Sequence, residues 1–172
     1  MNRPAQFVFL DFDGVLHPVF PYYDEDVPGN HHFRDAPAFE AVLRAHPDVQ
    51  VVISSSWRQH RSLDALRAKF SPDFGPRIVG KTPDPSEPHG TGSRQREIEA
   101  WLRAQGHEGA PWVAVDDAVF VFSPGACVVE TGDGFGPREA ALLTEALADP
   151  AAYALAHPLP APWPQPGHRS LR

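Results

Sequence analysis

The chain has 172 residues, of which 42% are hydrophobic, and 15 Lys and Arg against 22 Asp and Glu give a net charge of −7. This length suits one domain with a full core, and the negative charge counts against an extended, non-specific nucleic-acid surface. The single cysteine, Cys127, excludes an intramolecular disulfide and favours a reducing compartment. No apolar run approaches the roughly 18 residues of a membrane span, and the polar start MNRPAQ is unlike a signal peptide, so we expect a cytoplasmic protein.

Short apolar segments alternate along the chain with amphipathic segments. Apolar, β-branched or aromatic runs predict strands at 6–10, 49–53, 77–79, 112–115 and 126–129. Apolar residues at helical spacing predict helices marked by residues 39–43, 63–70, 98–102 and 140–147. This alternation predicts an α/β fold with three layers, Rossmann-like, built on a mainly parallel five-stranded sheet.

The end of the chain differs in composition from the rest. From residue 157 onward the sequence HPLPAPWPQPGHRSLR is rich in proline and has no periodicity. We therefore predict one folded domain over residues 1–150 and a Pro-rich C-terminal tail over residues 151–172.

Polar residues cluster where the predicted strands end. Asp11 and Asp13 follow the first strand, in DFDGVL, the serines at 54–56 follow the second, and Asp116 and Asp117 follow the fourth. The carboxyl ends of parallel strands form the usual ligand site of such sheets. Because a buried carboxylate is costly unless it is paired, protonated or metal-bound, the pattern predicts a functional site.

Carboxylates gathered at neighbouring strand ends would repel one another, and a Mg²⁺ ion bound by Asp11, Asp13 and Asp116 would remove that repulsion. Mg²⁺ also neutralises phosphoryl oxygens. An aspartate can attack phosphorus, and a second acid can protonate the leaving oxygen and then activate water. The histidines match no zinc-binding spacing, so we interpret them, His17 included, as loop and surface residues.

The motifs DFDGVL, a strand-end serine, a basic residue before the next strand and the pair DD resemble the four motifs of the haloacid dehalogenase (HAD) phosphatases, over roughly residues 6–148. The finer pattern DGVLHP, SSSWR and R-x-x-EI-x-x-WL is similar to the HAD domains of Swiss army knife RNA-repair proteins. The resemblance implies a Mg²⁺-dependent phosphomonoester hydrolase that acts through an aspartyl-phosphate.

The resemblance also implies roles for the acids. Asp11 would be the nucleophile and a metal ligand. Asp13 would be the general acid and base, with its backbone carbonyl facing the metal. Asp116 would bind the metal directly and Asp117 would support it.

The second motif leaves several assignments open. Ser55 would hold the phosphate, with Ser54 and Ser56 as neighbouring alternatives, and Ser56 could instead cap the following helix. Gly14 and Arg58 are candidate substrate contacts, although an ion-paired Arg58 fits the sequence equally well.

The third motif requires a cation that reaches both the nucleophile and the phosphate. Lys81 follows the third strand, and Arg94 lies at the start of the helix that leads to the fourth. The position at a helix N-terminus, which favours anions, inclines us to Arg94.

The spacing of the motifs leaves no room for a cap domain after the first or the second motif. An open site admits large substrates, so we expect a phosphorylated nucleotide or polynucleotide end first and a small metabolite second. The alternative to an enzyme is a non-catalytic binding module with the same fold. The sequence identifies no stable protein partner.

Overall fold

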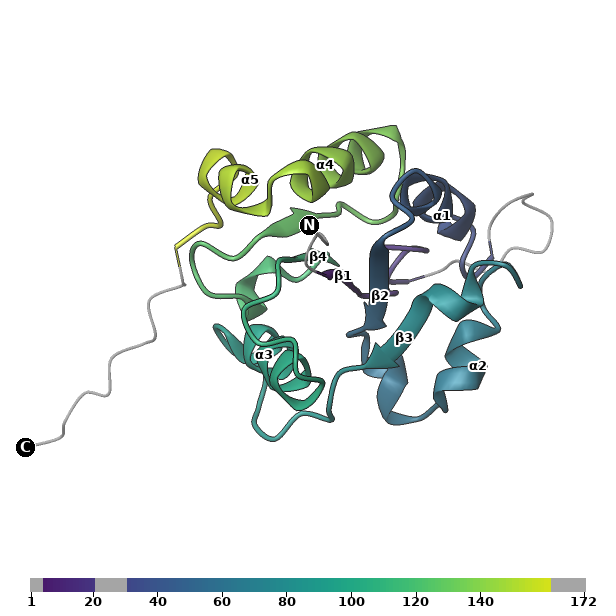
Figure 1. Cartoon of the computed structure of the whole chain (residues 1–172), viewed down its shortest axis with the longest axis horizontal. Coiled ribbons are helices and arrows are strands. Elements are labelled where there is room, and N and C mark those ends of the chain that lie inside the picture. The colour runs from purple at the N-terminus through teal and green to yellow at the C-terminus, as the bar shows by residue number, and fades with distance from the viewer. Residues whose placement is uncertain (1–4, 21–30, 162–172) are drawn as a thin grey trace, which may run out of the picture.

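A computed structural model describes residues 5–20 and 31–161 of the chain. Its sheet has five strands, every neighbouring pair parallel, in the order β3-β2-β1-β4-β5 (Figure 1). The strands are β1 (Gln6–Leu10), β2 (Val49–Ile53), β3 (Ile78–Lys81), β4 (Trp112–Asp116) and β5 (Val128–Glu130). The predicted parallel sheet is confirmed, with β3 and β5 shifted by one or two residues from their predicted bounds.

Helices cover both faces of this sheet, which confirms the three-layer, Rossmann-like prediction (Figure 1). One face carries α1 (Ala36–Arg44), α2 (Leu63–Arg67), α4 (Pro137–Ala148) and α5 (Pro150–Ala156). The other face carries α3 (Ser93–Ala104). Three 3₁₀ turns complete the connections, namely η1 (Ser56–Gln59), η2 (Gly75–Arg77) and η3 (Val119–Val121).

The central strand β1 shows why its sequence is apolar after Gln6. Val8 and Leu10 pack among the residues of α1 and α4, whereas Phe7 and Phe9 point to α3. The rings of Phe7 and Phe9 meet Trp101 of α3 edge-on, with centroids 5.4 and 5.8 Å apart. Since both faces of the strand are buried, Phe7 to Leu10 are all apolar, and the one polar residue, Gln6, donates its amide N–H to the Leu147 carbonyl at 3.0 Å.

The segment after β2 forms a 3₁₀ turn and a short helix, where the apolar spacing predicts one helix. Ser55 caps η1 by accepting a hydrogen bond from the Trp57 N–H, so the cap is not Ser56. Ser62 then begins α2 by accepting from the Ala65 N–H at 3.2 Å. Two caps seven residues apart thus replace one longer helix with two short ones.

The packed body extends beyond residue 150, where we placed the start of the tail. Pro150 opens α5, a position that tolerates proline, and the Asp149 carboxylate accepts the Ala152 N–H at 3.0 Å. Tyr153 is 3% exposed and packs in the core beside α4. Residues 162–172 of the predicted tail lie outside the described residues.

No additional domain interrupts the described segments that follow the first two motifs, so the fold is without a cap there, as predicted. The longest described helices, α3 and α4, have 12 residues each. Among the described residues, no helix is long and apolar enough to cross a membrane.

Candidate active site

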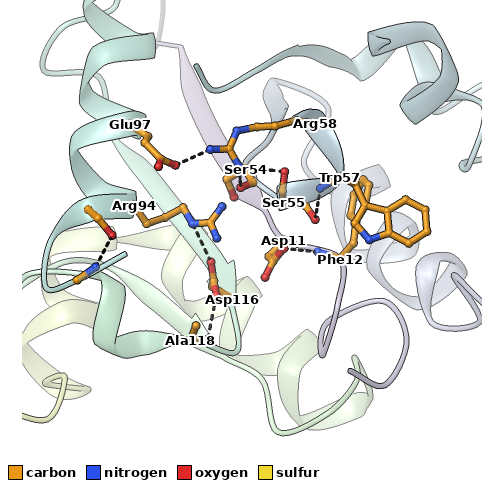
Figure 2. A network of polar contacts seen from close by, with 12 residues as sticks. Asp11, Phe12, Ser54, Ser55, Trp57, Arg58, Arg94, Glu97, Asp116 and Ala118 are labelled. Atoms are coloured by element: carbon orange, nitrogen blue, oxygen red, sulfur yellow. Dashed lines mark hydrogen bonds and ion pairs between the residues drawn. The ribbon is translucent and has the colours of Figure 1, made fainter. Parts of the chain in front are cut away.

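The carboxyl ends of β1, β2 and β4 bring the predicted site residues together. Leu10 lies beside Ile53 on one side and Val115 on the other, so the residues that follow these strands are neighbours. Figure 2 shows the side chains of Asp11, Ser55 and Asp116 grouped at this edge, with Arg94 reaching in from α3. The sheet topology therefore places motifs from four separate segments in one site.

Three acids form the centre of this group. One carboxylate oxygen from each of Asp11, Asp116 and Asp117 lies within 4.8 Å of the others. Asp116 accepts a hydrogen bond from the Ala118 N–H at 2.9 Å through Oδ1. Its Oδ2 is buried and has no hydrogen-bond partner within residues 5–20 and 31–161. A buried carboxylate oxygen without a donor, next to two more carboxylates, fits a hard divalent cation.

The protonation of these acids reflects their crowding. Burial, reinforced by the charge of Asp11, raises the pKa of Asp116 to about 7. The same two causes raise the pKa of Asp117 to about 6. Burial also raises the pKa of Asp11, although the positive charge of Arg94 opposes the shift. Without a metal, the cluster therefore retains protons at pH values where ordinary carboxylates have lost them.

Arg94 is the cation of this site. It lies at the start of α3, is 5% exposed, and holds its Nε 3.7 Å from Asp116 Oδ2. At that separation the two groups form an ion pair but no hydrogen bond. The Nε and Nη1 groups of Arg94 have no hydrogen-bond partner in the described part of the chain. A buried guanidinium with unused donors provides a site for an anion.

Lys81, the other candidate for the third motif, is engaged elsewhere. Its Nζ donates to the backbone carbonyls of Arg58 at 2.7 Å and Arg61 at 3.1 Å. It therefore fixes the turn after β2, and the geometry favours Arg94 as the third-motif cation.

The three serines after β2 have different environments. Ser55 is fully buried, and its hydroxyl is near enough to Asp11 to lower the pKa of that carboxyl. Ser54 is buried, and Ser56 is exposed in η1. Of the three serines, Ser55 is the one whose side chain affects the protonation of the predicted nucleophile.

Asp13 lies apart from the three-acid cluster and is held by two donors. His17 Nε2 lies 2.9 Å from Asp13 Oδ1, and Trp57 Nε1 donates to Oδ2 at 3.0 Å. His17 Nδ1 accepts from the Phe33 N–H at 3.3 Å, so the ring proton is on Nε2 and points to Asp13. The His17 bond, and then the Trp57 bond, lower the pKa of Asp13 against the effect of burial. The carboxylate of Asp13 is thus oriented away from a metal-binding role.

The comparisons with known proteins agree with this geometry. A family model described as the HAD domain in Swiss Army Knife RNA repair proteins matches residues 7–136, which is more than half of the chain. The chain belongs to this family. The match spans all the acids above and every strand apart from the first residue of β1. It confirms the predicted resemblance and supports a hydrolase of HAD type. No curated protein matches the chain.

In this HAD domain the Arg58 guanidinium is engaged inside the protein, which matches the ion-paired alternative rather than the substrate contact. Its Nη1 donates to the carbonyls of Ser54 and Ser55, and its Nε and Nη2 both donate to the carbonyl of Pro83. Nη2 also pairs with Glu97 Oε2 at 2.8 Å, and the residue is only 1% exposed. Arg58 therefore anchors the serine turn to α3 (Figure 2).

The backbone N–H and carbonyl of Gly14, the other candidate substrate contact, both have partners within the protein. Its N–H donates to the His17 carbonyl at 2.8 Å, and its carbonyl accepts from the Thr131 hydroxyl at 2.7 Å. Its φ is +72°, and an added Cβ would lie 2.6 Å from Asp117 Oδ2. Glycine is required here both for the backbone conformation and for the space that the Asp117 carboxylate occupies.

Gly14→Ala is expected to weaken metal binding. The new Cβ displaces Asp117, so the Mg²⁺ concentration that gives half of the full thermal stabilisation should rise about tenfold. Gly106→Ala is the matched control, because Gly106 has a φ of +75° and nothing within 4 Å of its Cβ position. Both variants should lose roughly 1 kcal/mol of stability to backbone strain. Equal Mg²⁺ midpoints for the two would contradict the role of Gly14.

The sequence did not identify the residues that orient Asp13. His17, interpreted as a loop or surface histidine, is fully buried. Its position four residues after Asp13 was the available signal, but the contact depends on a turn that a strand-end motif does not reveal. Trp57 has apolar ring contacts, as a core residue would, yet its indole N–H is committed to Asp13.

Proposed function

We propose that this HAD domain is a Mg²⁺-dependent phosphomonoester hydrolase that acts through an aspartyl-phosphate on Asp11. The observation that carries the proposal is the buried guanidinium of Arg94, whose Nε and Nη1 have no hydrogen-bond partner among the described residues. An anionic phosphoryl group placed there would be within reach of Asp11. It would fill the donors that the folded chain leaves unused.

The reaction has two steps in this geometry. An oxygen of Asp11 attacks phosphorus, the ester P–O bond breaks, and the leaving oxygen takes a proton from Asp13. Water then attacks the phosphorus of the aspartyl-phosphate, and Asp13 takes its proton. Inorganic phosphate leaves and the Asp11 carboxylate is restored. Ser55 and Arg94 hold the transferring group in both steps.

Asp11, Asp116 and Asp117 would hold the cation, with the backbone carbonyl of Asp13 as a further ligand. Mg²⁺ would supply positive charge that lets an anionic carboxylate approach an anionic phosphoryl group. We infer Mg²⁺ because the donors are all oxygen atoms.

The environment of Asp13 suits both of its roles. His17 and Trp57 favour its ionised form, which is the form that accepts a proton from water in the second step. A bound phosphoryl group brings negative charge beside it and favours the protonated form, which the first step requires.

For the substrate we propose a phosphorylated RNA or other polynucleotide end. The family is described by its occurrence in RNA repair proteins, and the described segments beside the site contain no cap that would exclude a large substrate. A small-metabolite phosphatase would share the same catalytic residues and differ in this preference. The single cysteine, Cys127, is buried and free, which fits a cytoplasmic location.

The test is phosphate release from 4-nitrophenyl phosphate and from a phosphorylated hexaribonucleotide, with Mg²⁺ or with EDTA. Arg94→Ala should lower kcat/KM for both substrates at least about a hundredfold, because it removes the donors aimed at the phosphoryl oxygens. Arg96→Ala, on the same helix but exposed and paired with Glu87, is the control and should stay near wild type. Equal activity of the two variants, or full activity in EDTA, would refute the proposal.

A further inference from the structure

In the proposed reaction, the position of Asp13 indicates the direction in which the rest of the substrate extends from its phosphate. As the residue that protonates the leaving oxygen, it must touch the part of the substrate beyond the phosphate. Its Oδ2 accepts the hydrogen bond from Trp57, so the indole lies just outside the reacting atoms. A pocket of about 320 Å³ opens beside this ring, lined by Ser56, Trp57, His60 and Arg61.

The chemistry of this pocket differs from that of the three-acid cluster. The Arg61 guanidinium lies over the Trp57 ring, 4.9 Å from its centroid. Arg61 and His60 are exposed, and none of the described residues that line the pocket carries a carboxylate. Within the described residues, Arg61 forms no ion pair with an acid. In a chain with a net charge of −7, this is an exposed cation stacked on an aromatic ring at the mouth of the site.

Further aromatic and basic groups continue this surface. The His32 ring lies 5.4 Å from Trp57, and the Lys69 ammonium is 5.9 Å from the Phe33 ring. Burial lowers the pKa of His32, the charges of His17, Lys69 and Arg61 add to that effect, and the charge of Asp13 opposes it.

The pocket is also held in shape before any ligand binds. Lys81 Nζ binds the carbonyl of Arg61 at 3.1 Å and that of Arg58 at 2.7 Å, which fixes the backbone at the end of η1. The Trp57 ring packs edge-on against Phe12 and Phe33 at 5.9 and 5.3 Å. A preformed site loses less conformational entropy when its ligand binds.

We propose that this pocket, the Trp57–Arg61 subsite, binds the terminal nucleoside of a single-stranded RNA whose end phosphate is removed. Its base would stack on the Arg61 guanidinium, which is supported from below by Trp57. Bases of single-stranded RNA are recognised by stacking on aromatic rings and on arginine planes. The positive charge of Arg61 also attracts the strand's phosphates. This inference rests on the proposed function, since it takes the end phosphate to lie between Asp11 and Arg94.

The experiment measures binding and turnover separately. Fluorescence anisotropy of a labelled, terminally phosphorylated hexaribonucleotide is recorded with the Asp11→Asn variant, alone and with Arg61→Ala, Arg61→Lys or Arg103→Ala added. Arg61→Ala should weaken binding about tenfold. Arg61→Lys should retain the salt dependence of binding but recover only part of the affinity, because a lysine has no planar group to stack. Arg103 is exposed and lies at the end of α3, so its variant removes the same charge and should have no effect.

In the otherwise wild-type enzyme, Arg61→Ala should also lower the ratio of kcat/KM for the hexaribonucleotide over that for 4-nitrophenyl phosphate about tenfold. The proposal is overturned if RNA binding does not depend on Arg61, or if a phosphopeptide loses as much affinity as the RNA. It is also overturned if the kcat/KM ratio does not change. If wild type releases no phosphate but RNA binding depends on Arg61, the proposed function has failed and the subsite stands.

Discussion

Asp11→Asn is expected to reduce phosphate release at least about a thousandfold, and in EDTA at neutral pH to make the protein more stable. The loss follows because an amide cannot replace the carboxylate that we propose as the nucleophile. The gain follows because Asp11 is a buried acid with a raised pKa that also raises the pKa values of Asp116 and Asp117. Asparagine keeps an oxygen that can accept the Phe12 N–H, now bonded to Asp11 Oδ1 at 2.8 Å.

Both effects are measured on the same preparation, by phosphate release with Mg²⁺ and by thermal melting in EDTA. Asp64→Asn is the control, because Asp64 has a side chain that is 90% exposed and lies on α2. It should change neither quantity. If the activity of Asp11→Asn is within tenfold of wild type, Asp11 is not the nucleophile. Lost activity together with a lower melting temperature would assign the loss to damaged folding.

The strand-end acids could be predicted because their placement depends only on the sheet. Once the apolar runs are interpreted as parallel strands, Asp11 and Asp116 must lie at the same edge, since each directly follows its strand or ends it. Ser55 joins them through the register of β1 and β2. No side-chain conformation has to be known for this prediction, which explains why the fold and the centre of the site agree with it.

The basic residues could not be assigned in the same way. Arg58 and Lys81 both lie near strand ends, but a long side chain reaches partners that the local sequence does not specify. The carboxylate of Glu97, 39 residues further along the chain, holds Arg58 inside the protein. Backbone carbonyls of a turn whose shape depends on two serine caps hold Lys81. The destination of a charged side chain is therefore a tertiary property, whereas the destination of a strand-end aspartate is a topological one.

The metal-free protein is expected to lose stability as the pH rises from about 4 to about 7, and Mg²⁺ is expected to remove most of that loss. The ordinary aspartate pKa is 3.8, whereas in the folded chain Asp116 titrates at about 7 and Asp117 at about 6. Between these values the folded state binds more protons than the unfolded state, so the free energy of unfolding falls with rising pH. The stabilising contribution of both acids is complete below pH 3.8 and is lost as the pH passes their folded pKa values.

In the proposed function Mg²⁺ would compete with those protons for the same oxygen atoms, so its stabilising effect should grow over the same pH range. The rise in melting temperature from EDTA to saturating Mg²⁺ should be about 5 °C larger at pH 8 than at pH 5. Asp116→Asn should flatten the pH dependence in EDTA and reduce the Mg²⁺ effect, whereas Asp64→Asn should preserve both. A Mg²⁺ effect of equal size at the two pH values would mean that the cation binds away from this cluster. Something other than a metal ion would then have to offset the repulsion among Asp11, Asp116 and Asp117.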